Sequence, residues 1–210
     1  MNLCAETHRI IQKPISIDWP LRKKLIREYK DLHYGDKVKL GKGFLMDPTV
    51  IVVHATATKT MRGAYNIFNH TTLRGRPEIQ MGGRMNVSVP YLVDRDGTIY
   101  QLHDDKIMGR QCIGLNYCSI GIENVGGIPQ APVTEKQIAA NVWLIAHLKK
   151  KYPQITYMIA HSEYRRCERL PIFIEKMPSY RTKKVDPGAW FMKKLRARLK
   201  KKSLKFLSCN

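Results

Sequence analysis

Three short runs of β-branched and apolar residues constrain the fold more than any other feature of this sequence. They read TVIVVHAT (49–56), SIGIENVGG (119–127) and ITYMIAH (155–161). Runs of this length and composition are typical of strands that are covered on both faces, because a strand with one face in solvent would alternate with polar residues. The sequence therefore predicts three buried strands.

A longer segment with helical periodicity lies between the second and third of these strands. From 133 to 151, Ile138, Val142 and Ile145 fall on one helical stripe, and Thr134 can cap the first turn. Strands that alternate with helices indicate an α/β protein. We expect a single domain in which a central mixed β-sheet is flanked by helices.

Weaker patterns complete the expected secondary structure. Asp96 and Gly97 lie between two apolar stretches and predict a β-hairpin. Helices are expected over 18–34 and 60–69, and an irregular loop over 70–86. These segments are consistent with the same α/β architecture.

The C-terminal sequence PGAWFMKKLRARLKKKSLKFL predicts a basic amphipathic helix that ends in a fraying tail. Phe191, Leu195 and Leu199 recur at helical spacing and are expected to pack inward. The lysines and arginines between them are then left on the solvent side.

The charge balance is unusual for a globular protein. Lys and Arg number 37 against 17 Asp and Glu, which gives a formal net charge of +20. Such a field favours polyanions, for example nucleic acid, anionic lipid or an acidic cell-wall polymer. Because no recognition-helix motif or zinc-finger spacing is present, we expect no specific nucleic-acid partner. No apolar run has the length of a membrane span, and the first residues lack the apolar stretch of a signal peptide.

The cysteines form no CxxC pair, which argues against a thiolate zinc site. We expect mostly free thiols, although Cys112 and Cys118 are close enough in the sequence to form a bridge in an oxidising compartment. An odd number leaves at least one thiol unpaired. The five are Cys4, Cys112, Cys118, Cys167 and Cys209.

Two histidines end predicted strands, and an acid lies in a turn before the last helix. His54 follows IVV, His161 follows ITYMIA, and Asp186 lies in VDPG. Strand ends of α/β sheets collect ligands and catalytic groups. Two imidazoles and a carboxylate suit Zn²⁺ and leave its fourth position for water. Each residue alone has an ordinary alternative, such as a turn-capping role for Asp186, and His70 is the least securely excluded of the other histidines.

Two further residues could serve hydrolysis at such a site. Glu123 is an acid inside an apolar strand, which is costly unless it is paired or functional. Its alternative is a carboxylate at a sheet edge, paired with an arginine. Lys184 stands two residues before Asp186, so an extended chain would project both side chains to one face. The alternative for Lys184 is a solvated lysine.

Taken together, these motifs resemble the zinc-dependent N-acetylmuramoyl-L-alanine amidases of type 2, relatives of phage amidase lysozymes and peptidoglycan-recognition proteins. The resemblance covers about 49–191. It implies that His54, His161 and Asp186 hold Zn²⁺. The motifs that carry it, in order along the chain, are IVVHAT, NVSVPYLVDRDGTIYQL, IGLNYCSIGIENVGG, IAHSEY and KVDPGAWF.

The resemblance also implies a reaction and two catalytic roles. Glu123 would orient and deprotonate the attacking water, and Lys184 would steady the oxyanion. The implied reaction is hydrolysis of the amide between the lactyl group of N-acetylmuramic acid and L-alanine of the stem peptide. The alternative is a non-catalytic peptidoglycan-binding protein of the same fold, which the filled ligand positions disfavour.

The sequence departs from the family pattern at Pro90 and Gln111, where many relatives have histidine. Neither position is a zinc ligand in the family, so we expect metal binding to survive and substrate preference or rate to differ. Because proline cannot donate a ladder hydrogen bond, the strand at Pro90 is expected to be an edge strand or bulged.

Substrate contacts are expected from the arginines of the long loop, which could meet stem-peptide carboxylates, and from two residues before the second strand. The C-terminal basic run could hold the protein on an anionic wall polymer. The expected substrate-binding residues are Arg74, Arg76, Arg84, Gln111 and Asn116.

The resemblance suggests a division of the chain into three parts. They are an N-terminal extension with a helix (1–46), a zinc amidase domain (47–192) and a basic C-terminal helix and tail (193–210). The expected partners are peptidoglycan or muropeptides, and the protein is expected to be a monomer. We expect a location in the cell envelope or outside the cell, with a cytoplasmic recycling role as the alternative.

Overall fold

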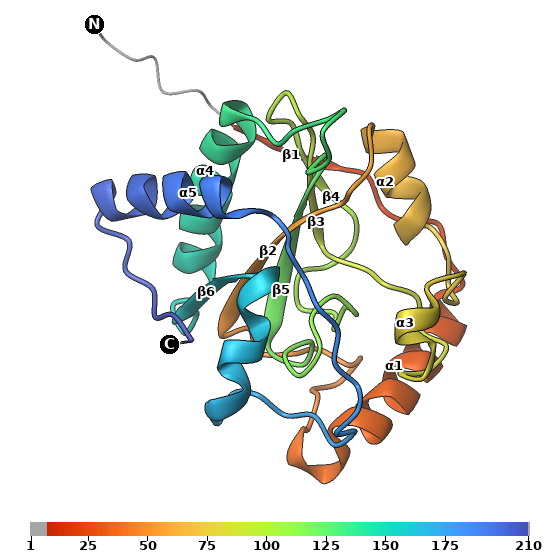
Figure 1. The fold of residues 1–210 in the computed structure, drawn as a ribbon. Helices are drawn as coiled ribbons and strands as arrows, with labels where there is room; N and C mark the ends of the chain where they lie inside the picture. Colours follow the sequence, from red (N-terminus) through yellow and green to blue (C-terminus); the bar gives the residue numbers. More distant parts are fainter. Residues whose placement is uncertain (1–7, 210) are drawn as a thin grey trace, which may run out of the picture.

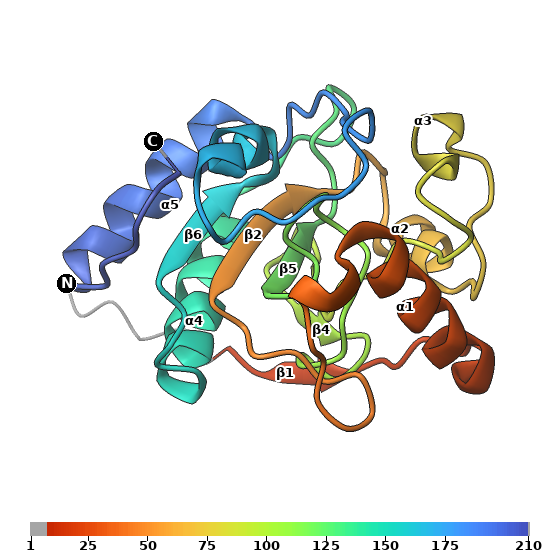
Figure 2. The same ribbon diagram turned by 90° about the horizontal axis from the view of Figure 1, so that it is seen from below.

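A computed structural model describes residues 8–209 and shows a six-stranded sheet between two layers of helices (Figure 1). Helices α4 and α5 cover one face, and α1, α2 and α3 lie on the other side (Figure 2). The strands are β1 (Ile10–Gln12), β2 (Val50–Ala55), β3 (Tyr91–Val93), β4 (Ile99–Gln101), β5 (Ser119–Asn124) and β6 (Tyr157–Ala160). The helices are α1 (Trp19–His33), α2 (Met61–Phe68), α3 (Pro77–Gln80), α4 (Glu135–Lys151) and α5 (Ala189–Lys201), with 3₁₀ segments η1 (Gly35–Lys37) and η2 (His161–Arg169).

The order of the strands is β1-β4-β3-β5-β2-β6, which confirms the expected mixed sheet. The hairpin β3–β4 is antiparallel, and the other pairs are parallel. The expectation of an edge strand at Pro90 was wrong, because β3 lies between β4 and β5. Pro90 precedes the strand, so the ladder does not need its missing N–H, and its carbonyl accepts a hydrogen bond from the Leu102 amide at 2.8 Å.

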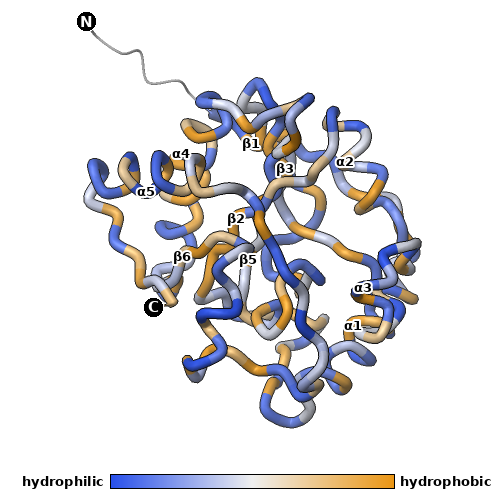
Figure 3. Tube along the Cα trace, in the orientation of Figure 1, coloured by the Kyte–Doolittle hydropathy of each residue, from blue (hydrophilic) through white to orange (hydrophobic). Residues whose placement is uncertain are grey.

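Strand β2 shows how the core and the site divide the two faces of the sheet. Ile51 and Val53 belong to the core under α4 and α5, whereas Val50 and Val52 belong to the core on the opposite face. Side chains alternate along a strand, so His54 continues the second set. Figure 3 shows hydrophobic residues along the buried strands and mixed hydrophilic and hydrophobic turns in the surrounding helices.

The helices on the first face follow the predicted stripes. Ile138 and Ile145 of α4 are fully buried, as are Phe191 and Leu195 of α5. Thr134 caps α4 in a capping box with Gln137, and the two helices pack against each other over β2 and β5. None of the described helices is long and apolar enough to cross a membrane.

The C-terminal tail is held in place, so the expectation that it frays was wrong. The Leu207 amide donates to the Thr156 carbonyl at 2.8 Å, and the Leu207 carbonyl accepts from Met158 at 3.4 Å, beside the edge strand β6. A disulfide joins Cys167 of η2 to Cys209. Pairing with the tail covers backbone groups that an edge strand would otherwise expose.

The same disulfide corrects the expectation of mostly free cysteines. Cys112 and Cys118 are free and buried, and Cys4 lies outside the described residues. Cys167 and Cys209 are 42 residues apart. No local pattern signals a pair at that separation, because the fold alone brings the two residues together.

Among the strands and α-helices, two short elements were not expected. Strand β1 has three residues, and α3 is a single turn inside the loop predicted to be irregular. The N-terminal helix α1 begins after Asp18, whose carboxylate accepts from the Leu21 amide at 2.9 Å. Its buried His33 contacts both carboxylate oxygens of Glu175 at 2.9 Å, so α1 is anchored to the segment that follows η2.

Candidate metal centre

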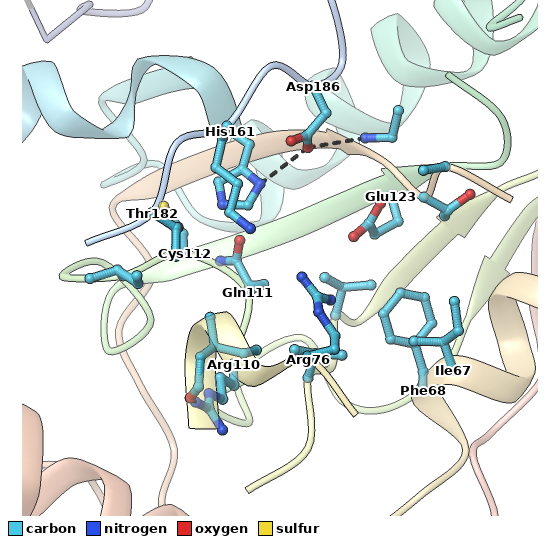
Figure 4. Close-up of a pocket in the computed structure, with 18 of the residues that line it drawn as sticks. Ile67, Phe68, Arg76, Arg110, Gln111, Cys112, Glu123, His161, Thr182 and Asp186 are labelled. Carbon is cyan, nitrogen blue, oxygen red and sulfur yellow. Dashed lines mark hydrogen bonds and ion pairs between the residues drawn. The ribbon is translucent and has the colours of Figure 1, made fainter. Parts of the chain in front are cut away.

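His54, His161 and Asp186 converge at one end of the sheet. His54 is near the end of β2, and His161 directly follows the neighbouring strand β6, so their rings lie 4.4 Å apart between centroids. Asp186 lies in the turn before α5. Its Oδ2 lies 3.5 Å from His54 Nδ1 and 3.1 Å from His161 Nδ1, and Figure 4 shows the contact with His161.

The donor set and its electrostatics fit a divalent cation. One ligand atom from each residue lies within 4.8 Å of the others. Burial lowers the pKa of His161 to about 4, so its ring is neutral and can offer a lone pair. Burial opposes ionisation of Asp186, but the imidazoles of His161 and His54 beside it hold the pKa of its carboxyl well below the usual range. Two imidazoles and an ionised carboxylate are a suitable set for Zn²⁺.

Glu123 lies beside this cluster. In the parallel pairing of β2 and β5 it is the register partner of His54, so both side chains project from the same face of the sheet. Its Oε2 is buried without a hydrogen-bond partner, and burial raises the pKa of Glu123 to about 7. The alternative of an arginine-paired carboxylate at a sheet edge is wrong, because β5 is an interior strand and no ion pair of Glu123 occurs within residues 8–209. A carboxyl group with this pKa can act as a general base near neutral pH.

The cluster opens into a cavity of about 800 Å³, a size suited to a substrate fragment. Lys184 is half-buried on its wall, and burial together with Arg76 lowers the pKa of Lys184. Arg74 and Arg76 also line the cavity, and Arg76 Nε is 3.0 Å from Glu78. Figure 4 shows Arg76 across the cavity from Asp186.

Arg84 does not line this cavity. Its side chain is exposed and lies 3.2 Å from Glu28 of α1. His70 does line the cavity, but the cluster of potential ligands found in the described part of the chain does not include it. Of the three loop arginines, the structure therefore brings only Arg74 and Arg76 to the site.

Gln111 and Asn116 line the cavity, yet their polar atoms bond to the protein. Gln111 Oε1 lies 2.6 Å from His54 Nε2. Asn116 Oδ1 accepts from the amides of Gln111 and Cys112, each at 2.7 Å, and its Nδ2 donates to the Tyr29 hydroxyl at 3.0 Å. The two side chains are thus used to hold the wall of the site.

The cavity-wall residues that sequence reasoning missed include Tyr29, Arg110 and Tyr180. The buried Arg110 donates to the Met85 carbonyl at 2.6 Å and to the Tyr180 hydroxyl at 2.9 Å. No motif marks these residues, since they come from three distant segments and meet only in the folded chain.

Comparisons with known proteins agree with this architecture. A family model described as N-acetylmuramoyl-L-alanine amidase matches residues 45–189. Endolysins of Enterobacteria phage K11 and Klebsiella phage KP32 are 31% and 32% identical over 84 residues, which is 38% of this chain. Because the match covers 56% of each, the chain spans little more than half the length of these curated relatives.

Solved structures show the same fold at lower identity. The N-acetylmuramoyl-L-alanine amidase LysC from Clostridium intestinale URNW is 19% identical with a TM-score of 0.53, over 92% of this chain and 99% of that chain. Bumblebee PGRP-SA is 18% identical with a TM-score of 0.53, over 96% of this chain and 98% of that chain. The family match extends over more than half of the chain. The chain therefore belongs to the N-acetylmuramoyl-L-alanine amidase family.

Proposed function

We propose that this protein is a zinc-dependent peptidoglycan amidase. Its substrate is the amide between the lactyl group of N-acetylmuramic acid and L-alanine of the stem peptide. The observation that carries the proposal is the convergence of His54, His161 and Asp186 beside the unpartnered carboxyl group of Glu123, in a chain of this family.

Each residue has a role that follows from its place. The imidazoles of His54 and His161 and the ionised Asp186 would hold Zn²⁺, and the chemistry that the ion supplies when bound is Lewis acidity toward the scissile carbonyl and the attacking water. Glu123 takes the proton of that water, because its Oε2 has no hydrogen-bond partner of its own. Lys184 faces the same cavity and stabilises negative charge that develops on the carbonyl oxygen.

The positive rim of the cavity suits an acidic stem peptide. Arg74 is exposed at this rim, and Arg76 is partly buried there. Guanidinium groups bind carboxylates through two parallel hydrogen bonds, so these arginines are placed to orient a peptide that carries free carboxylates. Gln111 and Asn116 shape the wall next to them, and Arg84 lies too far out to share this role.

We also propose that the protein acts as a monomer on the cell wall in an oxidising location. The disulfide between Cys167 and Cys209 favours such a location over a cytoplasmic one. The exposed Lys200 and Lys201 at the end of α5, and Lys202 just beyond it, supply a basic surface that suits an anionic wall polymer.

The test is digestion of purified muropeptides followed by mass spectrometry. We expect release of stem peptides with a free L-alanine amino terminus, loss of this release with a chelator, and its recovery on addition of Zn²⁺. His161→Ala should abolish release. The matched control His147→Ala, an exposed histidine of α4, should leave it unchanged.

The alternative is a protein of the same fold that binds peptidoglycan without cleaving it. It would be supported if wall fragments bound tightly while no new L-alanine amino terminus formed in the presence of Zn²⁺. Equal release from His161→Ala and the unaltered protein would contradict the proposed zinc site.

A further inference from the structure

The imidazole of His54 lies between Asp186 of the ligand cluster on one side and the side chain of Gln111 on the other. Its Nδ1 faces Asp186 in the ligand cluster, and its Nε2 lies 2.6 Å from Gln111 Oε1 on the other side. An amide oxygen can only accept a hydrogen bond. The proton of a neutral ring is therefore placed on Nε2, which leaves the Nδ1 lone pair pointing into the cluster.

The orientation of the Gln111 amide is set by Ser119 at the start of β5. Gln111 Nε2 donates to Ser119 Oγ at 2.6 Å and lies 3.5 Å from the Ser119 carbonyl oxygen. Turning the amide over would bring Gln111 Oε1 against that carbonyl oxygen, and both atoms are acceptors. This contact would be unfavourable, so Ser119 selects the orientation in which Gln111 offers an acceptor to His54.

The fold reserves space for this side chain. A Cβ at Gly121 would lie 3.1 Å from Gln111 Cδ and 3.2 Å from Gln111 Cγ, and 2.7 Å from a methyl group of Val89. Gln111 thus crosses β5 in a slot that exists because residue 121 has no side chain. Any larger residue at this position would push Gln111 away from His54.

The backbone of Gln111 is anchored as well. Asn116 Oδ1 accepts from the Gln111 amide, and Asn116 Nδ2 donates to the hydroxyl of Tyr29 in α1. The N-terminal helix is thereby connected through two residues to a ligand of the cluster. Tyr29, Asn116 and Gln111 are all buried or partly buried. Buried hydrogen-bond networks hold their side chains in one geometry.

We infer that Gln111 is a positioning residue, which fixes the ring orientation and tautomer of His54 so that Nδ1 is presented to the metal. This role replaces direct substrate binding by Gln111. The inference rests on the proposed function for the identity of the ion. Residues that orient metal ligands in this way typically contribute about 10- to 100-fold to metal affinity.

The test compares Gln111→Met, which keeps the shape but removes the acceptor, with Gln111→Glu, which keeps an acceptor. Gln130→Met is the control, since Gln130 is exposed in a turn far from the cluster in sequence. The ring nitrogens of His54 are observed by ¹⁵N NMR in the Zn²⁺-loaded protein, and Zn²⁺ affinity is measured by competition with a chromophoric chelator.

We expect the Nε2–H tautomer in the unaltered protein and in Gln111→Glu. Gln111→Met should show a mixture of tautomers and bind Zn²⁺ about 10- to 100-fold more weakly. An unchanged tautomer and an affinity within about two-fold in Gln111→Met would overturn the inference. If Gln111→Met does not fold, Ser119→Ala provides the same comparison, because it frees the amide to turn over.

The NMR measurement separates this inference from the proposed function. A protein that cleaves no muropeptide but shows the Gln111-dependent tautomer would leave the positioning role intact and reject the amidase. An active amidase in which the His54 tautomer does not depend on Gln111 would support the amidase and reject the positioning role.

Discussion

Glu123→Gln should make the protein less active and more stable at the same time. The substitution keeps the size of the side chain and removes the group that accepts the proton. We expect the rate of amide cleavage to fall by about 10²- to 10⁴-fold, the usual contribution of a positioned general base. The opposite effect on stability follows from the burial of an unpartnered carboxyl group in β5.

The size of the stability gain follows from the pKa of Glu123. Burial raises this pKa from 4.5 to about 7 in the folded protein. The unfolded chain releases the proton near pH 4.5 and the folded chain near pH 7, so ionisation of Glu123 destabilises the fold progressively across this window. The full penalty is present above the folded pKa. Each unit of pKa difference corresponds to about 1.4 kcal/mol, and we reduce the resulting free energy to about 2–3 kcal/mol because solvent reaches part of the cavity.

The assay is denaturant unfolding of the metal-free protein and of Glu123→Gln at several pH values. The variant should be more stable by about 2–3 kcal/mol at about pH 8, and this difference should shrink toward zero near about pH 4. Glu135→Gln is the control, since Glu135 is an exposed residue of α4 paired with Lys194 and Arg198. It should show neither the gain in stability nor the loss of activity.

Two results would refute this reasoning. A difference in stability that does not vary with pH would mean that burial does not raise the pKa of Glu123. Cleavage within a few-fold of the unaltered rate would mean that another group accepts the proton.

Asp105→Asn should show the opposite pH dependence. Burial opposes ionisation of Asp105, but hydrogen bonds from Tyr152 and Lys151 lower the pKa of Asp105 below the usual value. Its ionised form therefore stabilises the fold above the usual carboxyl pKa, and this stabilisation is lost as the pH falls through the lowered pKa. Unfolding measured against pH should show a deficit in the variant near neutral pH that narrows in acid, and a constant deficit would contradict the assignment. Cys209→Ser should lower the free energy of unfolding by up to about 3–4 kcal/mol, because the disulfide to Cys167 closes a loop of 42 residues. A reductant should lower the free energy of unfolding of the unaltered protein to about that of the variant. The same reductant should leave the free energy of unfolding of Cys209→Ser unchanged.

The main elements were predictable because their signals are local. Val50 to Val53 form a buried strand since β-branched residues pack well in a covered sheet. Ile138 and Ile145 place one face of α4 in the core through helical spacing alone. The candidate ligands were predictable in part for the same reason, as His54 and His161 each follow a recognisable strand.

Other features depend on residues that are distant in the sequence. Arg84 carries the same charge as Arg76, yet the backbone directs it to Glu28 and away from the cavity. Cys209 meets Cys167 because the tail runs beside β6. Neither outcome is encoded in the residues next to these positions.

By itself, the sequence determined the buried strands, the long helices and the kind of chemistry that His54, His161 and Asp186 can support. Tertiary structure alone decided the order of the strands, the pinned tail and the contact between Gln111 and His54 across Gly121. The physical reason is the separation in sequence over which each interaction acts. Apolar periodicity and turn chemistry act over a few neighbouring residues, whereas a hydrogen bond between strands, a slot left by a missing side chain and a disulfide require the whole chain to be packed.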